Sequence, residues 1–324
     1  MTAQPMVLVL AESDDPQLKM LSGTPHAVAR DDAGIAAVAG EAAVILHWSG
    51  QRERLRAAFL ACPHVRWIHS RWAGVDSLLF PELVASDVPL TNGSGVFSQS
   101  LGEFALAAIL YFAKDFPRML RNQRAERWEP FDVDEIAGQT VGIVGYGDIG
   151  RAVARRVHAM GMQVLALKRH FPEQPVFPQQ PDPLVDQFYK PEAMAEMLGR
   201  CDYVVVTAPL TEETRHMVGA AQFAAMKASA VVINVGRGPV IDQAALVRAL
   251  QEGRIRGTGL DVFEHEPLSP GDALWSMENV LISPHTADHT RDWIDAAMRF
   301  FLRQYEHFVK GEPLENVVNK RLGY

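Results

Sequence analysis

The sequence contains few of the residues that mark a secreted, metal-binding or nucleic-acid-binding protein. Only two cysteines, Cys62 and Cys201, occur in 324 residues, and they form no C-x-x-C pair. This usage indicates a reducing compartment, so we expect a cytoplasmic protein without a cysteine-based metal site. Acidic residues outnumber basic residues, 39 to 31, and the net charge is −8. A surface for nucleic acid or for an anionic membrane is therefore not expected.

Long apolar runs are also missing. The longest unbroken run, 104–113, is well short of the roughly 20 residues of a membrane-spanning helix. The apolar run at 6–11 has no basic segment before it and acidic residues after it, so it does not predict a signal peptide. With 48% hydrophobic and 22% charged residues the composition is that of a globular chain, and the length predicts about two domains.

The first hundred residues alternate short apolar runs with amphipathic stretches. The runs that predict strands are 7–10, 43–46 and 65–68. A helix is predicted at 51–61, and this order is typical of a parallel sheet built from βαβ units. A turn cluster at 91–95 precedes a long apolar helix, expected to run from Ser98 or Ser100 to about residue 113. Ser100 and Glu103 have the spacing of a capping box at its start.

A second and clearer alternation begins at residue 140. The predicted strands are 140–144, 163–167, 203–207, 231–235, 256–262 and 280–283. A helix is predicted at 148–160, whereas the stretch 170–183 is rich in Pro and Gln and predicts a surface loop. A final helix, 290–308, could pack back onto the N-terminal domain and make that domain discontinuous.

A glycine-rich loop connects the first strand of this second alternation to its helix. It has the pattern G-x-G-x-x-G and consists of Gly145, Tyr146, Gly147, Asp148, Ile149 and Gly150. Between a strand and a helix, this pattern predicts a dinucleotide site, a ligand-free turn being the alternative. Gly145 allows a tight turn, Gly147 lets the backbone approach a pyrophosphate, and Gly150 allows the helix to pack closely on the strand. The N-terminus of the helix faces the negative charge.

The residues after the next strand bear on which dinucleotide binds. An NAD site usually has an acidic residue there, which accepts hydrogen bonds from the adenosine ribose. Here the strand ends in Lys168, Arg169 and His170, without a carboxylate. Because Lys and Arg form charge-assisted hydrogen bonds with phosphate, we expect NADP(H) to be preferred over NAD(H). An ordinary solvated strand end is the alternative.

Three charged or titratable side chains follow three successive predicted strands. They are Arg237, Glu266 and His285, after strands 231–235, 256–262 and 280–283. Residues beyond the carboxyl ends of strands in an open α/β sheet line the ligand crevice, so we expect the three to converge beside the nicotinamide. His285 and His289 are four residues apart, but without a third ligand they do not predict a metal site.

The order and spacing of these motifs resemble the D-isomer-specific 2-hydroxyacid dehydrogenase family over nearly the whole chain. The matching segments are AGVD at 73–76, GEFA at 102–105, the loop at 145–150, APLT at 208–211, NVGRG at 234–238, LDVFEHEP at 260–267 and SPH at 283–285. The combination is specific, whereas each piece alone is weak. The chain looks most similar to the glyoxylate/hydroxypyruvate reductase branch, partly because of RWAGVD at 71–76 and the cationic strand end.

The resemblance implies an α/β fold with two Rossmann-like, doubly wound parallel-sheet domains separated by a cleft. One domain is flavodoxin-like and binds the substrate, and it would combine residues 1–102 with 286–324. The other, residues 103–285, would bind the dinucleotide. A homodimer through this second domain, to which 104–128 contributes, is also implied.

The implied reaction is the reduction of a small 2-oxo acid, such as glyoxylate or hydroxypyruvate, to the D-2-hydroxy acid. His285 is the expected general acid, because imidazole titrates near physiological pH. Glu266 would favour the imidazolium, and it is preferred to Glu264 because the catalytic carboxylate of the family directly precedes proline. Arg237 would bind the substrate carboxylate bidentately.

The resemblance also implies the remaining site residues. The backbone amides of Gly74 and Val75 would hold the second side of the substrate carboxylate, and Asp261 would bind the carboxamide end of the cofactor. The nicotinamide pocket would be lined by Thr207, Ala208, Pro209 and Val235. Asp288 departs from the family, which has small residues after its catalytic histidine, and it could cap the following helix.

Two other functions remain open alternatives. A dinucleotide-sensing regulatory protein would keep the fold without turnover, but it would not need the complete set of Arg237, Glu266 and His285. Formate or phosphite oxidation is disfavoured because the formate enzymes of the family replace the residue at Glu266. The substrate side chain also stays open. Residues that could face it are Trp48, Trp72, Trp293, Arg71, Arg118, Arg121 and Arg291, although packing or solvated roles are commoner for such residues.

Overall fold

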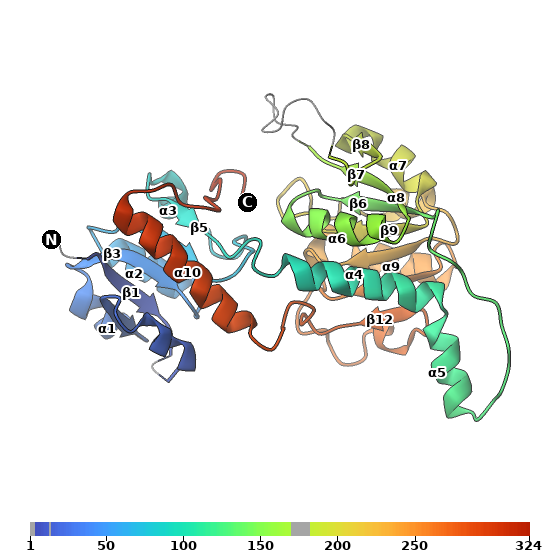
Figure 1. Cartoon of the computed structure of the whole chain (residues 1–324), viewed down its shortest axis with the longest axis horizontal. Helices are drawn as coiled ribbons and strands as arrows, with labels where there is room; N and C mark the ends of the chain where they lie inside the picture. The colour runs from blue at the N-terminus through green and yellow to red at the C-terminus, as the bar shows by residue number, and fades with distance from the viewer. Residues whose placement is uncertain (1–3, 13, 170–181) are drawn as a thin grey trace. The chain divides into compact units, whose positions relative to one another are not determined.

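The computed structural model describes residues 4–12, 14–169 and 182–324. The chain divides into two compact units (Figure 1). The first unit combines Met1–Phe97 with Thr290–Tyr324, and the second is Ser98–His289. The sequence placed these boundaries at 102/103 and 285/286, a few residues inside the second unit.

The first unit contains a five-stranded sheet in the order β2-β1-β3-β4-β5. All its strand pairs are parallel. The strands are β1 (Met6–Leu10), β2 (His26–Ala29), β3 (Ala42–His47), β4 (Trp67–Ser70) and β5 (Leu90–Thr91). The helices are α1 (Asp32–Val38), α2 (Arg52–Ala61), α3 (Pro81–Ala85), α10 (Trp293–Lys310) and the 3-10 helix η1 (Pro16–Leu21).

The C-terminal helix α10 belongs to this first unit, although 192 residues of the second unit precede it in the chain. Its apolar face packs on the sheet, where the Phe301 ring stacks on the Trp67 ring with centroids 5.5 Å apart. Gln17 of η1 also donates a hydrogen bond to Asp295 of α10 at 3.0 Å. The helix is therefore an integral part of the unit and covers residues of β4.

The second unit contains a seven-stranded sheet in the order β12-β11-β10-β9-β6-β7-β8. The strands are β6 (Thr140–Val144), β7 (Gln163–Leu167), β8 (Gln187–Tyr189), β9 (Tyr203–Val206), β10 (Val231–Asn234), β11 (Gly257–Leu260) and β12 (Val280–Ile282). All its strand pairs are parallel as well. The chain order reverses between β6 and β9, so this pair is the topological switch point.

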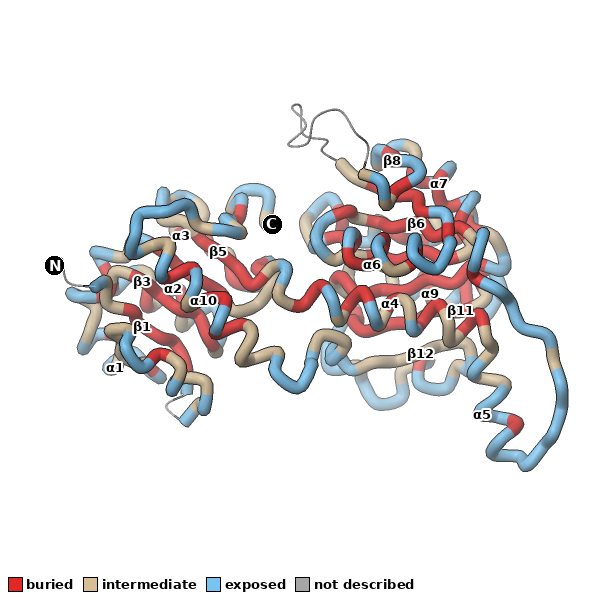
Figure 2. Tube along the Cα trace, viewed as in Figure 1, coloured by how far each residue is buried: buried red, intermediate tan, exposed pale blue. Residues whose placement is uncertain are grey.

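Helices cover both faces of this sheet, and its central strands are buried (Figure 2). The helices are α4 (Ser98–Ala113), α5 (Phe116–Arg124), α6 (Asp148–Ala159), α7 (Met194–Arg200), α8 (Ala220–Ala225) and α9 (Gln243–Gln251). Short 3-10 helices are η2 (Pro191–Ala193), η3 (Gly238–Val240) and η4 (Ala273–Ser276). No helix of the described residues has both the length and the apolar composition needed to span a membrane.

The capping box predicted for the long apolar helix is wrong. Helix α4 begins at Ser98, so Ser100 lies inside its first turn. The Ser100 hydroxyl donates to the carbonyl oxygen of Ala287, and Glu103 forms an ion pair with Arg156 at 3.1 Å. Both side chains bond to residues far along the chain, which local sequence spacing does not reveal.

Candidate active site

The glycine-rich loop lies at the switch point of the larger sheet, between the end of β6 and the start of α6. Gly145 has a φ of +96°, and a Cβ there would lie 2.6 Å from Ala208 Cα. A Cβ on Gly150 would lie 2.5 Å from the Gly145 carbonyl oxygen. By contrast, the Cβ position of Gly147 has no other atom within 4 Å. Two glycines thus allow the turn and the close packing, while the third leaves the loop open to a ligand.

The segment after β9 lies against this loop. The Thr207 hydroxyl donates a hydrogen bond to the Gly145 carbonyl oxygen, and Ala208 is the residue nearest the Gly145 Cβ position. The Pro209 carbonyl oxygen accepts from the Thr214 hydroxyl at 2.7 Å, which fixes the turn that follows. Val235, after the neighbouring strand β10, is buried. These residues form one wall at the carboxyl edge of the sheet.

The cationic end of β7 has acidic neighbours that the sequence did not reveal. Arg169 forms an ion pair with Glu213, and the Lys168 ammonium lies 5.9 Å from the centroid of the Tyr146 ring. Asp182 Oδ2 accepts from both the Tyr146 hydroxyl and Arg151 Nε, each at 3.0 Å. His170, the third residue of the predicted cluster, lies outside the described residues.

The Asp182 carboxylate is held in its charged form. Burial alone would raise its pKa, but hydrogen bonds from the Leu184 amide, Tyr146 and Arg151 outweigh burial and lower it. We predicted no role for 170–183, and no local signal could have placed Asp182 beside the glycine loop. The region beyond the end of β7 therefore contains the carboxylates of Glu213 and Asp182 as well as basic side chains, whereas the sequence indicated basic side chains only.

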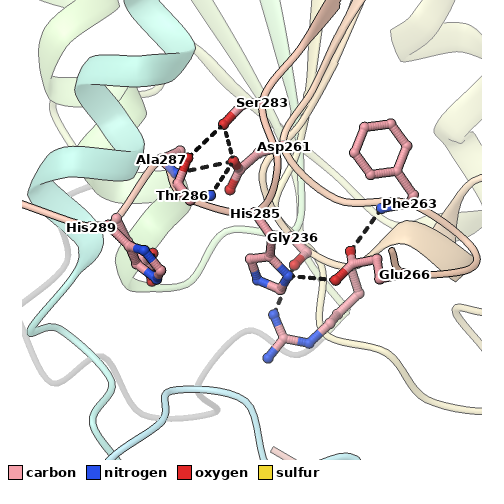
Figure 3. A network of polar contacts seen from close by, with 11 residues as sticks. Gly236, Asp261, Phe263, Glu266, Ser283, His285, Thr286, Ala287 and His289 are labelled. Carbon is pink, nitrogen blue, oxygen red and sulfur yellow. Dashed lines mark hydrogen bonds and ion pairs between the residues drawn. The ribbon is translucent and has the colours of Figure 1, made fainter. Parts of the chain in front are cut away.

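Glu266 and His285 form a hydrogen-bonded pair at the carboxyl edge of β11 and β12. His285 Nδ1 lies 2.7 Å from Glu266 Oε2, and the Phe263 amide donates to the other carboxylate oxygen at 2.9 Å (Figure 3). Arg237 follows β10, the next strand of the sheet, and its Nη1 donates to the Gly236 carbonyl oxygen at 2.8 Å. Its positive charge acts on both members of the pair.

The pair favours an imidazolium beside a carboxylate. The hydrogen bond to Glu266 raises the pKa of His285 above its usual 6.5, against the opposing effects of burial and of Arg237. Burial would raise the pKa of Glu266, but the hydrogen bonds from His285 and Phe263 and the nearby positive charges lower it. Such a pair can give up a proton from the imidazolium and regain it.

The neighbouring carboxylate, Glu264, is engaged elsewhere. Its Oε1 lies 2.7 Å from His216 Nε2, and its amide donates to Gln243 Oε1 at 3.2 Å.

A Cβ on Gly238 would overlap the Phe263 carbonyl group, so the Arg237 loop lies backbone to backbone against the loop that carries Glu266. Glycine is therefore the only residue type that position 238 can hold without a backbone shift.

Asp261 organises the loop that carries His285. Its Oδ1 accepts from the Ser283 hydroxyl at 2.6 Å and from the amides of Thr286 and Ala287 at 2.9 and 3.0 Å (Figure 3). The His285 amide also donates to the Asp261 carbonyl oxygen at 2.9 Å, and His285 has a φ of +55°. Among the described residues the buried Oδ2 of Asp261 has no hydrogen-bond partner, so it can accept from a ligand.

Asp288 is half-buried in the same loop and does not cap the following helix, which begins at Trp293 after Asp292. Its Oδ1 lies 3.7 Å from His289 Nε2. Burial raises its pKa, and the positive charges of His289 and His285 partly oppose that rise. No group of three or more His, Cys, Asp or Glu that could hold a metal occurs in the described part of the chain.

Gly74 and Val75 lie in the first unit, on the loop after β4. Val75 is buried and Gly74 is half-buried. The loop is fixed by Asn92 Nδ2, which donates to the Ala73 carbonyl oxygen at 2.6 Å, and by the Gly93 amide, which donates to the Trp72 carbonyl oxygen at 3.0 Å. A role for this loop in substrate binding stays a prediction.

The second unit fits a bound dinucleotide. The open Gly147 position would admit a pyrophosphate, the Asp261 Oδ2 would accept from a carboxamide, and both belong to one sheet edge. A family model described as D-isomer specific 2-hydroxyacid dehydrogenase, NAD binding domain, matches residues 106–287. The chain belongs to this family. The resemblance seen in the motifs is confirmed, and so is the fold class of two parallel-sheet α/β domains.

Relatives within the family include reductases of small 2-oxo acids. A glyoxylate reductase of Korarchaeum cryptofilum is 34% identical over 82% of this chain and 79% of its own length. A glyoxylate/hydroxypyruvate reductase B of Klebsiella pneumoniae is 36% identical over 75% of each chain.

Solved structures of the family share the fold over the whole chain. The D-isomer specific 2-hydroxyacid dehydrogenase of Xanthobacter autotrophicus, in complex with NADPH and MES, is 31% identical with a TM-score of 0.83, covering 99% of this chain and 100% of that one. The NADPH-dependent glyoxylate/hydroxypyruvate reductase of Sinorhizobium meliloti, in complex with NADP and sulfate, has the same TM-score and coverage at 27% identity. Chains of this family therefore bind NADP(H) on the same fold.

Proposed function

We propose that this protein reduces a small 2-oxo acid, of the size of glyoxylate or hydroxypyruvate, to the D-2-hydroxy acid with NADP(H). The observation that carries the proposal is the His285–Glu266 pair, 2.7 Å apart, on the strand-end edge that also holds the glycine loop. A proton donor on a dinucleotide-binding edge is what carbonyl reduction requires. The named activities of the curated relatives support the same substrate class.

The chain's own residues supply proton transfer and substrate orientation. The nicotinamide, when bound, supplies the hydride that adds to the carbonyl carbon. Arg237 binds the substrate carboxylate and polarises the adjacent carbonyl group. His285, held at Nδ1 by Glu266, gives the proton on Nε2 to the carbonyl oxygen as the alcohol forms. Glu266 stabilises the imidazolium before this step and fixes the plane of the ring.

Cofactor contacts in the proposal follow the strand ends. Residues 145–150 cradle the pyrophosphate, and Asp261 Oδ2 accepts from the carboxamide N–H. Thr207, Ala208, Pro209 and Val235 line the nicotinamide pocket. Lys168 and Arg169 bind the 2′-phosphate, so that NADP(H) is preferred over NAD(H). In the first unit, the amides of Gly74 and Val75 hold the substrate carboxylate, as the family resemblance implies.

We also propose that two copies associate through the second unit. Apolar side chains on α5 and the segment after it are at least 40% exposed: Phe116, Met119, Leu120, Trp128 and Val133. Trp128 is 98% exposed. Exposed apolar patches of this kind mark association surfaces. Sedimentation should show a dimer for the wild type and a monomer for the double variant Leu120→Asp/Trp128→Ser, whereas an unchanged mass would exclude this surface.

Oxidation of NADPH and NADH tests the proposed reaction directly. Nicotinamide absorbance is followed with glyoxylate, hydroxypyruvate, pyruvate and phenylpyruvate, and the same assays use His285→Asn. The wild type should turn over with preference for NADPH, and His285→Asn should lose roughly 10²–10⁴-fold in kcat while still binding NADPH. Tight NADPH binding without turnover of any 2-oxo acid would favour a dinucleotide-sensing regulatory protein instead.

A further inference from the structure

Four arginines could face a second charge on the substrate, and the structure separates one from the others. Arg118 forms an ion pair with Glu129 at 2.8 Å, and Arg121 forms one with Glu278 at 2.7 Å. Arg291 is exposed. Arg71 differs from all three because its Nε is buried and has no hydrogen-bond partner among the described residues.

Arg71 lies within a cage of three tryptophans. Its Cζ lies 5.0 Å from the centroid of the Trp48 ring, 4.3 Å from that of Trp72 and 5.6 Å from that of Trp293. The rings of Trp72 and Trp293 also contact each other, with centroids 5.7 Å apart. We call these four residues the Arg71 cage.

The Arg71 cage lies at a ligand-binding position of the fold. Trp48 directly follows β3, and Arg71 directly follows β4, its parallel neighbour in the sheet. Trp293 is the first residue of α10. Ligands of open α/β sheets bind outside the carboxyl ends of the strands, which is where both of these residues stand.

Stacking leaves the guanidinium suited to bind an anion. A guanidinium that stacks on aromatic rings keeps the N–H groups along its edge, and these can bind a carboxylate bidentately. Burial lowers the pKa of Arg71, but an arginine remains charged at neutral pH. Its acidic neighbour Asp15 raises that pKa and accepts hydrogen bonds from Trp48 Nε1 at 2.8 Å and from the Gln17 amide at 3.1 Å.

The loop that holds Arg71 is also fixed in place. The Arg71 amide donates to the His47 carbonyl oxygen at 3.2 Å, and a Cβ on Gly93 would overlap the Arg71 carbonyl group. The loop continues within three residues to Gly74. Three residues span at most about 10 Å, so one small molecule could reach both ends of this loop.

We propose that Arg71 binds the second carboxylate of a dianionic 2-oxo acid, so that four- and five-carbon 2-oxodicarboxylates are substrates of this protein. The inference rests on the proposed reductase function and names a substrate class for it. Within the first unit, the Gly74–Val75 amides hold the first carboxylate, and Arg71 holds the distal carboxylate. The tryptophans exclude water from that ion pair and thereby strengthen it.

Matched pairs of substrates test the proposal. Oxaloacetate is compared with 2-oxobutyrate, and 2-oxoglutarate with 2-oxopentanoate, each pair having the same chain length and differing in the distal carboxylate. The ratio of kcat/KM within each pair is measured for wild type, Arg71→Gln, Arg71→Lys and the control Arg118→Gln. Arg71→Gln should lower the dianion preference roughly 10- to 100-fold, Arg71→Lys should restore part of it, and Arg118→Gln should leave it unchanged.

The outcomes separate this inference from the reductase proposal. Glyoxylate turnover by wild type and by the control Arg118→Gln reports on the reductase proposal alone, since glyoxylate has no distal group. Equal ratios in wild type and Arg71→Gln, or equal losses for both members of a pair, would overturn the assignment of Arg71 while glyoxylate turnover upholds the reductase. If wild type reduces no 2-oxo acid, the reductase proposal fails instead. Stabilisation by D-malate in a thermal melt, present in wild type and lost in Arg71→Gln, would then still uphold the Arg71 site, and its absence in wild type would overturn it.

Discussion

His285 Nδ1 lies 2.7 Å from Glu266 Oε2, and the second oxygen of that carboxylate is fixed by the Phe263 amide at 2.9 Å. Glu266 thus orients the imidazole at Nδ1, and the Phe263 backbone amide in turn fixes the Glu266 carboxylate. Asp261 fixes the loop that carries His285, because its carboxylate accepts hydrogen bonds from the amides of Thr286 and Ala287. The His285 imidazole is therefore held in place by contacts to both flanking loops.

The first prediction concerns the pH dependence of reduction. His285 must be protonated, and Glu266 raises its pKa above 6.5, so kcat/KM should be highest below that raised pKa and fall as pH rises through it. Glu266→Gln removes the largest effect that raises the pKa and leaves burial and Arg237, which lower it, and Asp261, which raises it. The decrease of kcat/KM should then occur at lower pH, in a profile measured from about pH 5 to 10. Glu264→Gln is the matched control. An equal shift of the decrease in kcat/KM in both variants would contradict the role of Glu266 in raising the pKa of His285.

The second prediction separates two glycines of the same loop. A methyl group at Gly147 meets no atom of the protein, whereas one at Gly150 meets the Gly145 carbonyl oxygen. Gly147→Ala should therefore keep its melting temperature and lose about tenfold or more in NADPH affinity, because the methyl group occupies the space of the pyrophosphate. Gly150→Ala should lose about 1–3 kcal/mol of stability. Thermal melts and NADPH fluorescence titrations measure both, and unchanged NADPH affinity in Gly147→Ala would place the pyrophosphate elsewhere.

The third prediction concerns the carboxylates at the end of β7. Glu213 pairs with Arg169, so its carboxylate competes with a 2′-phosphate for the Arg169 guanidinium. Glu213→Gln should raise the NADPH/NADH ratio in kcat/KM, while Lys168→Ala and Arg169→Ala should each lower it roughly tenfold. Arg155→Ala, an exposed arginine on α6, is the control for the loss of a positive charge. A ratio that is the same in all four variants would reject the 2′-phosphate site.

The sequence predicted the central strands of both sheets because they are nearly continuous apolar runs between turns. It missed the edge strands β2, β5 and β8. Strands β2 and β8 are only partly buried, so their apolar signal is weak, and β5 has only two residues. Helix α5 was also missed, since the chain turns at Asp115 with a φ of 47° before the helix starts. Local periodicity does not show such a break.

The proximity of Arg237, Glu266 and His285 was predictable, because each of them follows the end of a strand. Asp182 was not predictable, because it follows a loop of biased composition and returns to Tyr146 only in the folded chain. The Arg71 cage was not predictable either. Its residues come from β3, β4 and α10, and their proximity depends on the strand order and on the return of the C-terminal helix to the first unit.

The last prediction concerns acid stability of the first unit, which buries two histidines on neighbouring strands. His69 Nδ1 lies 2.8 Å from the Thr91 hydroxyl, its ring contacts Phe300 and Phe301, and burial lowers its pKa to about 3. Burial likewise lowers the pKa of His47 to about 4. An unfolded histidine titrates near 6.5, so below that pH the unfolded chain binds protons that the folded chain does not. The contribution of these histidines to the free energy of unfolding should therefore be complete above about pH 6.5 and decrease as pH falls towards 4. The decrease should be up to about 1.4 kcal/mol per pH unit for each histidine.

His69→Gln isolates one of these two groups. The variant should lose about 1–3 kcal/mol at neutral pH, because a buried hydrogen bond and ring contacts are removed, but its stability should depend less steeply on pH. The slope should decrease by up to about 1.4 kcal/mol per pH unit between pH 6.5 and 4. Urea unfolding followed by tryptophan fluorescence reports on this region, since Trp67 contacts His69 directly. His64→Gln, an exposed histidine of the same unit, should keep the wild-type slope. Parallel slopes for wild type and His69→Gln would show that the acid sensitivity of the unit arises from other groups.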